Sequence, residues 1–167
     1  LSDLVYQLTS GKQRARMQSG SNQERARGDT WACCAVTNGN VSAVETISGY
    51  KNAPIAEAQR MLECKAGKTH FVSKKVTDDF SETITDNWGH AGSIYVQYVI
   101  NNLEQVKKTL KTMQVRIDKK ANLKAENRFW SAGVACTLTG LLIAKHLGLI
   151  DYDLKKVEQW ALKQLEI

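Results

Sequence analysis

The chain has almost no proline and no long apolar run. Its single proline, Pro54, excludes a proline-rich linker. No uninterrupted apolar stretch approaches the roughly 20 residues that a membrane-spanning helix needs. No charged region followed by an apolar one marks a signal peptide, so we expect a cytoplasmic protein that does not enter a membrane. Regular structure is predicted directly from Leu1, so we also expect a segment of a longer protein.

Cysteine and histidine are too few and too scattered to predict a metal site. The four cysteines form no CxxC pair, and the adjacent Cys33 and Cys34 would point to opposite faces of a strand. The three histidines show no metal-ligand spacing, so we predict no structural zinc and no other metal. Buried, reduced thiols are the expected state of Cys33, Cys34, Cys64 and Cys136.

The sequence also lacks the motifs of common catalytic sites. The phosphate-binding pattern GxxxxGK[ST] occurs nowhere, although Lys12 follows Gly11. No convincing order of Ser, His and Asp, no paired carboxylates and no Cys–His pattern indicates a nucleophile. These absences exclude a complete P-loop site within the chain.

A basic segment with three glycines, residues 11–29, is the main candidate for a nucleic-acid contact. The chain of 167 residues has a formal net charge of +6, which permits attraction to a polyanion. Within the segment only Glu24 and Asp29 oppose five cations. Such a segment can follow a phosphate backbone, but its lack of aromatic residues argues against readout of base sequence. A solvated loop or a subunit contact is the alternative to nucleic-acid binding through Lys12, Arg14, Arg16, Arg25 and Arg27.

The amino-terminal half is predicted to contain short helices around a buried strand. Residues 30–37 form an apolar run without a helix breaker, as is typical of a strand in a parallel sheet. Residues 61–65 are a candidate second strand, and residues 66–87 are expected to be irregular. Gly11 should end the first of three helices, which are predicted over residues 1–8, 41–48 and 55–60.

The carboxy-terminal half is predicted to be a helical bundle. Apolar residues at steps of three and four indicate one long helix over residues 89–120, and its basic flanks are interpreted as a solvated lysine face. A more apolar helix is expected over residues 127–147, with Gly133 and Gly140 at close helix contacts and Gly148 at its end. A last helix begins at Asp151 or Asp153, and its inner face is expected to contain Leu154, Val157, Trp160, Ala161 and Leu165.

Two short patterns are candidates for phosphate chemistry. Thr37 and Asn38 follow the predicted strand, where P-loop ATPases place a polar side chain that hydrogen-bonds the attacking water or the γ-phosphate. An ordinary Asn-Gly turn is the alternative. Arg60 follows a predicted short helix and would suit an arginine finger, whereas an ion pair with Glu57 or Glu63 is the alternative. Spacing alone favours the alternative in both cases.

Several segments together resemble the carboxy-terminal part of a phage and prophage P-loop ATPase domain of helicase type. In chain order they are SGKQRARM, WACCAVTNGNVS, EAQRMLE, NWGHAG and NRFWSAG. The resemblance implies that Thr37 and Asn38 are a sensor position and that Arg60 is an arginine finger. It further implies that Arg128 is a second sensor that reaches the phosphates from a helical lid.

The fold class expected from this resemblance is α/β. Residues 1–87 would hold the later strands of a P-loop ATPase sheet, and residues 88–167 a helical lid or bundle. The implied function is ATP-driven translocation or unwinding of DNA by a homo-oligomeric ring, whose basic segment contacts single-stranded DNA without sequence specificity. ATP and Mg²⁺ would be bound by Walker residues of the full-length protein, so this segment alone is expected to be inactive. The alternative is a non-catalytic nucleic-acid-binding or assembly domain of a phage replication or packaging complex; a third possibility is a module whose basic segment contacts an acidic protein.

Overall fold

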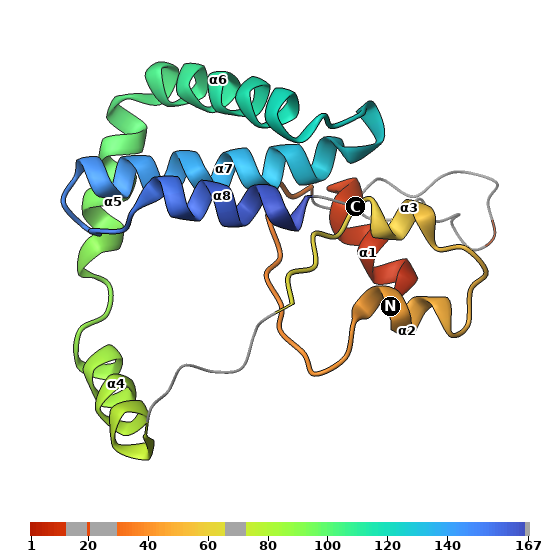
Figure 1. The fold of residues 1–167 in the computed structure, drawn as a ribbon, viewed down its shortest axis with the longest axis horizontal. Coiled ribbons are helices and arrows are strands. Elements are labelled where there is room, and N and C mark those ends of the chain that lie inside the picture. Colours follow the sequence, from red (N-terminus) through yellow and green to blue (C-terminus); the bar gives the residue numbers. More distant parts are fainter. Residues whose placement is uncertain (13–19, 21–29, 66–72, 166–167) are drawn as a thin grey trace. The chain divides into compact units, whose positions relative to one another are not determined.

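The computed structural model describes residues 1–12, 20, 30–65 and 73–165, which form parts of two compact units, Leu1–Glu63 and Cys64–Ile167 (Figure 1). The described residues are mostly helical (68%), and beyond one isolated antiparallel bridge between Lys12 and Thr30 they contain no strand. The predicted α/β class is therefore wrong, because no P-loop sheet exists among these residues. None of the described helices is both long and apolar enough to cross a membrane. The domain boundary predicted near residue 87 stays a prediction.

The run predicted to be a buried strand is irregular and exposed. Residues 31–39 adopt neither helix nor strand, and Val36 is 91% exposed. A strand is stable only where neighbouring strands bind its backbone N–H and C=O groups, and residues 61–65, the second predicted strand, are irregular as well. The start of the run is held by α1 (Ser2–Ser10) and the residue after it. Trp31 donates its backbone N–H to Gly11 O (2.9 Å) and its indole N–H to Leu8 O (3.0 Å).

The first unit contains three short helices, whose ends agree closely with the sequence. Gly11 ends α1 in the left-handed conformation (φ 67°), as predicted, and a Cβ there would lie 2.8 Å from Trp31 O. The second helix, α2 (Ala43–Ser48), begins after Ser42, whose hydroxyl accepts the backbone N–H of Glu45 at 3.1 Å. Pro54 precedes the third, α3 (Ile55–Ala58).

Two carboxylates bring these helices together. Glu63 accepts the backbone N–H of Ala43 (2.5 Å) and the hydroxyl of Ser42 (2.7 Å), so it adds a second cap to the start of α2. Glu57 on α3 is 1% exposed and accepts the hydroxyl of Ser2 on α1 at 2.5 Å. Polar contacts therefore contribute to holding the described part of the first unit together.

The second unit differs from the prediction at two places. Residues 74–86, within the segment expected to be irregular, form α4 (Lys74–Asp86), which is capped by the hydroxyl of Ser73 on the backbone N–H of Val76 at 3.4 Å. The predicted long helix is divided into α5 (His90–Asn101) and α6 (Leu103–Ala121). Asn102 leaves the helical conformation, and its side-chain amide donates to Tyr98 O at 2.9 Å, a local bond that competes with the helical pattern.

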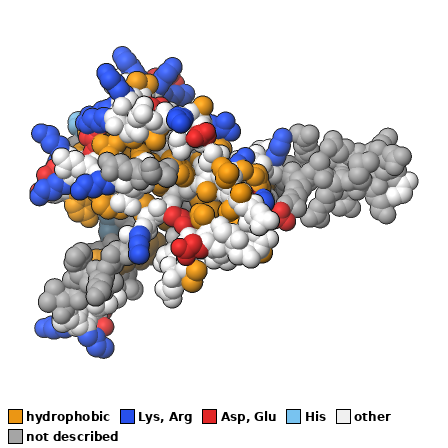
Figure 2. Space-filling view, turned by 45° about the vertical axis from the view of Figure 1, so that its right-hand side comes forward, with side chains coloured by type: hydrophobic (Ala, Val, Ile, Leu, Met, Phe, Trp, Pro, Cys, Tyr) orange, Lys and Arg blue, Asp and Glu red, His pale blue; other side chains and the backbone are white. Residues whose placement is uncertain are grey.

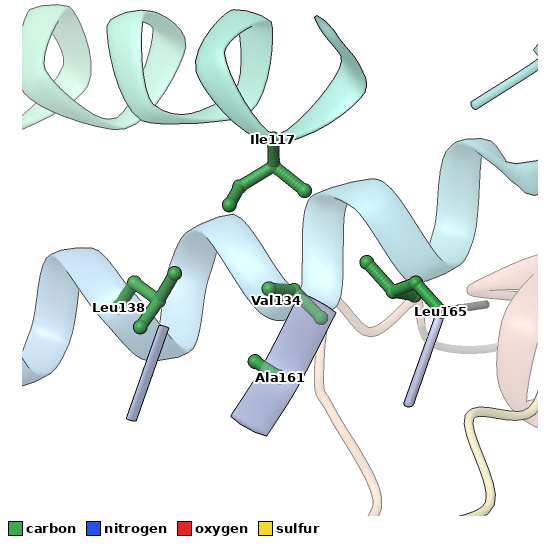
Figure 3. Close-up of a cluster of buried hydrophobic side chains, with 5 residues drawn as sticks. All are labelled: Ile117, Val134, Leu138, Ala161 and Leu165. Carbon is green, nitrogen blue, oxygen red and sulfur yellow. The ribbon is translucent and has the colours of Figure 1, made fainter. Parts of the chain in front are cut away.

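The remaining helices form an antiparallel bundle around a small apolar core. After a short 3₁₀ helix η1 (Ala125–Asn127), α7 (Arg128–His146) runs back along α6, and α8 (Leu154–Gln164) returns along α7 (Figure 1). Side chains from all three elements and the residue after α8 meet in Figure 3, where Ile117 of α6 points down toward Val134 of α7. The buried cluster consists of Ile117, Val134, Leu138, Ala161 and Leu165.

Three details of this bundle bear on the predictions. The close contact expected at Gly140 is confirmed, because a Cβ there would lie 3.3 Å from the Tyr95 hydroxyl of α5. The one expected at Gly133 is wrong, since no atom of another element among the described residues lies within 4 Å of a Cβ built there. The end of α7 near Gly148 (φ 69°) and the cap of α8 by Asp153 are also confirmed. The prediction that Trp160 faces inward is wrong, because Trp160 is 53% exposed, whereas the neighbouring Ala161 is buried.

The prediction of buried thiols is also wrong. All four cysteines are free and exposed. Cys33 and Cys34 belong to the irregular run, Cys64 follows the second predicted strand, and Cys136 lies on an exposed side of α7. Because the expected sheet is absent from the described residues, it cannot cover the first three of these side chains.

Candidate nucleic-acid interface

Positive charge is concentrated in the bundle of α6, α7 and α8. Residues 103–165 contain twelve Lys and Arg against six Asp and Glu, which gives this part of the chain a formal charge of +6. The rest of the chain contains eleven of each kind and is formally neutral. The whole net charge of the protein therefore belongs to the bundle and its connecting turns.

The outer face of α6 carries lysines that have no carboxylate partner in the described part of the chain. The side of α6 that packs on its neighbours contains Met113 and Ile117, and the helical repeat places Lys108, Lys111 and Lys119 away from it. All three lysines are exposed, and no ion pair involves them among the described residues. In Figure 2, Lys and Arg side chains gather at the upper end of the view, where α6 lies in Figure 1.

Other cations of α6 are occupied by acids. Lys107 pairs with Glu104 at 2.8 Å on the exposed surface. Arg116 and Lys120 both reach Glu158 of α8, with N–O distances of 2.5 and 2.8 Å. The Glu158 side chain is only 11% exposed, whereas the two cationic side chains are 50% and 45% exposed. This carboxylate therefore links α6 to α8 from a sheltered position.

Because Glu158 is the sole acid of α8, its inward position leaves the outer side of that helix entirely without carboxylates. Lys155, Lys156 and Lys163 are exposed there, and none of them has an ion-pair partner within the described ranges. A shallow groove along α6 has a lining that includes two cations and no carboxylate: Gln105, Lys108, Thr109, Thr112, Met113, Arg116 and Leu142. The cations of α6 and those of α8 can each attract a polyanion.

The structure places the predicted phosphate-site residues in different surroundings. Thr37 and Asn38 are exposed in the irregular run of the first unit. Arg60, also in the first unit, is half-buried; its guanidinium donates to Ala56 O (2.7 Å) and lies 4.5 Å from the centre of the Tyr6 ring. Arg128 starts α7 in the second unit, with its guanidinium 5.0 Å from the Phe129 ring.

The guanidinium of Arg60 packs on the Tyr6 ring of α1. Thr37 and Asn38, the predicted sensor position, do not follow a strand, because residues 31–39 are irregular. The catalytic roles of Thr37, Asn38, Arg60 and Arg128 stay predictions. Of the predicted nucleic-acid contacts, Lys12 is exposed beside the bridge to Thr30, and Arg14, Arg16, Arg25 and Arg27 lie outside the described residues.

One titratable group of the first unit is strongly perturbed. The pKa of Glu57 is lowered to about 2, first by its hydrogen bond with the Lys51 ammonium and then by the hydroxyl of Ser2. From the sequence alone, Glu57 is a candidate only for an ion pair with Arg60. Its contacts tie α3 to the start of α1, which is a structural arrangement. Within the described ranges, no three His, Cys, Asp or Glu residues gather closely enough to hold a metal ion.

Comparison of the chain with protein-family models, with curated proteins and with solved structures yields no match. The resemblance to the ATPase domain, the ATP-driven motor and its cofactors ATP and Mg²⁺ therefore stay predictions. ATP hydrolysis by the full-length protein, measured with and without single-stranded DNA, tests them directly. The α6 lysines without an ion-pair partner among the described residues and the exposed Trp160 were missed as site candidates, although the lysines were visible in the sequence as basic flanks of an apolar stripe.

Proposed function

We propose that the chain is a non-catalytic, helical nucleic-acid-binding domain that contacts the phosphate backbone of DNA without reading base sequence. The observation that carries the proposal is the outer face of α6, where Lys108, Lys111 and Lys119 are exposed and lack ion-pair partners among the described residues. The proposed setting is an assembly of several copies on DNA, as in a phage replication or packaging complex.

Pairing decides which cations can contribute to such binding. A lysine that already neutralises a carboxylate adds little when it meets a phosphate, whereas an unpaired lysine that neutralises a phosphate releases a condensed counterion. Lys108 and Lys119 are separated by about 16 Å along the helix axis. The three lysines can therefore follow a strand over several phosphates, and their flexible side chains on an exposed helix face favour backbone contact over base readout.

The test is a variant with Lys108→Gln, Lys111→Gln and Lys119→Gln. Its affinity for two unrelated DNA sequences should fall alike, and the slope of log affinity against log salt should become shallower by about 3 if each lysine contacts one phosphate. Fluorescence anisotropy between low and moderate salt measures both quantities.

A matched control removes the same formal charge from lysines that are already paired. Lys74, Lys107 and Lys145 form ion pairs with Asp78, Glu104 and Asp151, so replacing these three lysines with Gln should change the slope much less. Equal effects of the two triple variants would show that only net charge matters and would remove the assignment to α6. A loss of affinity that differs between the two DNA sequences would contradict binding through the phosphate backbone alone.

A further inference from the structure

Trp160 lies exposed on the outer side of α8. The inner side of this helix is occupied by Val157 and Ala161, which contact the apolar core, and by Leu165 just after the helix. Trp160 remains 53% exposed. Single exposed apolar residues are common on protein surfaces, so the exposure alone has no functional meaning.

Two lysines beside Trp160 distinguish it from an isolated exposed apolar residue. Lys156 and Lys163 precede and follow it by four and three residues, so they share its side of α8. Both are exposed and have no ion-pair partner within the described part of the chain. The sole carboxylate of the helix, Glu158, faces Arg116 and Lys120 of α6 instead. The surface thus consists of an aromatic ring between two cations, with no acid on α8 to oppose it.

We infer that this outer side of α8 binds single-stranded nucleic acid, with the Trp160 indole stacked on an unpaired base and Lys156 and Lys163 on the flanking phosphates. The inference rests on the proposed function and adds the strand state of the partner. Aromatic stacking on bases tolerates any sequence, because every base has a flat face. A convex helix surface cannot present its indole to a base face inside a duplex, since those faces are already stacked. Single strands are therefore favoured over duplex DNA.

The experiment compares two labelled ligands of equal length, a thymine oligonucleotide and an oligomer with the same sugar–phosphate backbone but without bases. Trp160→Ala in the full chain should weaken binding of the oligonucleotide roughly tenfold, as expected for loss of one stacked base. Binding of the abasic oligomer should not change. Trp160→Phe should restore most of the affinity for the oligonucleotide. Trp88→Ala, which removes a 77% exposed tryptophan just before α5, is the matched control and should affect neither ligand.

Each of the other possible results would refute either the stacking of Trp160 or the proposed function. Equal affinity of Trp160→Ala and the unchanged chain for the oligonucleotide would remove the stacking inference while the α6 proposal stands. Equal losses on both ligands would show that Trp160 acts by supporting the helix. Tighter binding of polyglutamate than of the oligonucleotide, if lost in Trp160→Ala, would assign the surface to an acidic protein. No binding of either ligand by the unchanged chain at low salt would refute the proposed function itself.

Discussion

Replacing Glu158 with Gln tests the structure and the proposed interface together. Breaking a fully buried ion pair costs about 3–5 kcal/mol. Here the carboxylate is 11% exposed, but the side chains of Arg116 and Lys120 are 50% and 45% exposed, so water can hydrate both cations after the change. The Gln amide oxygen can still accept one hydrogen bond. We therefore expect the free energy of unfolding to fall by about 2 kcal/mol, and Tm by roughly 10 °C for a unit of this size.

The same substitution should strengthen binding to DNA. Glu158→Gln frees the charges of Arg116 and Lys120 at the edge of the positive surface. If both then neutralise a phosphate, the slope of log affinity against log salt becomes steeper by about 2. Urea unfolding followed by circular dichroism measures the first effect, and anisotropy titrations at several salt concentrations measure the second. Stability and affinity should thus change in opposite directions.

The control is Glu104→Gln, which breaks an exposed pair with Lys107 whose side chains are 86% and 60% exposed. An exposed pair of this kind contributes about 0–1 kcal/mol, so stability should hardly change. If the Glu158→Gln variant were no less stable than the Glu104→Gln variant, the role of Glu158 in linking α6 to α8 would be refuted. A clear loss of stability without any gain in DNA affinity would show that the α6–α8 edge lies outside the path of the nucleic acid.

Three further predictions concern stability. Ile117→Ala should lower the free energy of unfolding by about 3–4 kcal/mol in urea titrations, because Ile117 is 0% exposed at the centre of the core; the exposed Val115→Ala on the same helix should change it by less than about 0.5 kcal/mol. Thr139→Val should raise the free energy of unfolding by about 1 kcal/mol, because the buried Thr139 hydroxyl has no hydrogen-bond partner among the described residues; a loss of stability would reveal a partner. The pKa of Glu57 is about 2 in the folded state, against 4.5 for the unperturbed group, so its contribution to stability should be complete above about pH 5 and disappear as the pH falls toward 2. Unfolding of the first unit in Glu57→Gln should lack this pH dependence, and an unchanged profile would assign it to another acid.

The helix ends and much of the bundle could be predicted because local chemistry determines them. Gly11 and Gly148 adopt positive φ values where the sequence indicates helix ends, and Asp153 accepts the backbone N–H groups of the first turn of α8. The apolar stripe from Val106 to Ile117 faces the neighbouring helices as predicted. The single helix predicted over residues 89–120 is wrong, since Asn102 interrupts it, and Val96 in its first part is 53% exposed.

The strand and the position of Trp160 could not be predicted because they depend on distant partners. An apolar run such as residues 30–37 has the composition of a buried strand, yet a strand requires neighbours, and none occurs among the described residues. Trp160 and Ala161 are adjacent at the edge of one stripe, about 100° apart around the helix. The buried position is filled by the small Ala161, where α8 contributes to the core. The composition of the stripe does not reveal which of the two is buried.

The same limit applies to charge, and it explains why the basic flanks of α6 could be interpreted as a solvated face. The sequence shows the lysines, but it does not show which carboxylates pair with them. In the structure Arg116 and Lys120 share the sheltered carboxylate of Glu158, whereas Lys108 and Lys111 have no ion-pair partner among the described residues. Free cations on one face retain their full attraction for phosphate, and the inward carboxylate cannot screen them from its position between the helices. A solvated face and a binding face therefore differ in pairing rather than in composition, and the Glu158→Gln variant changes pairing at a single site.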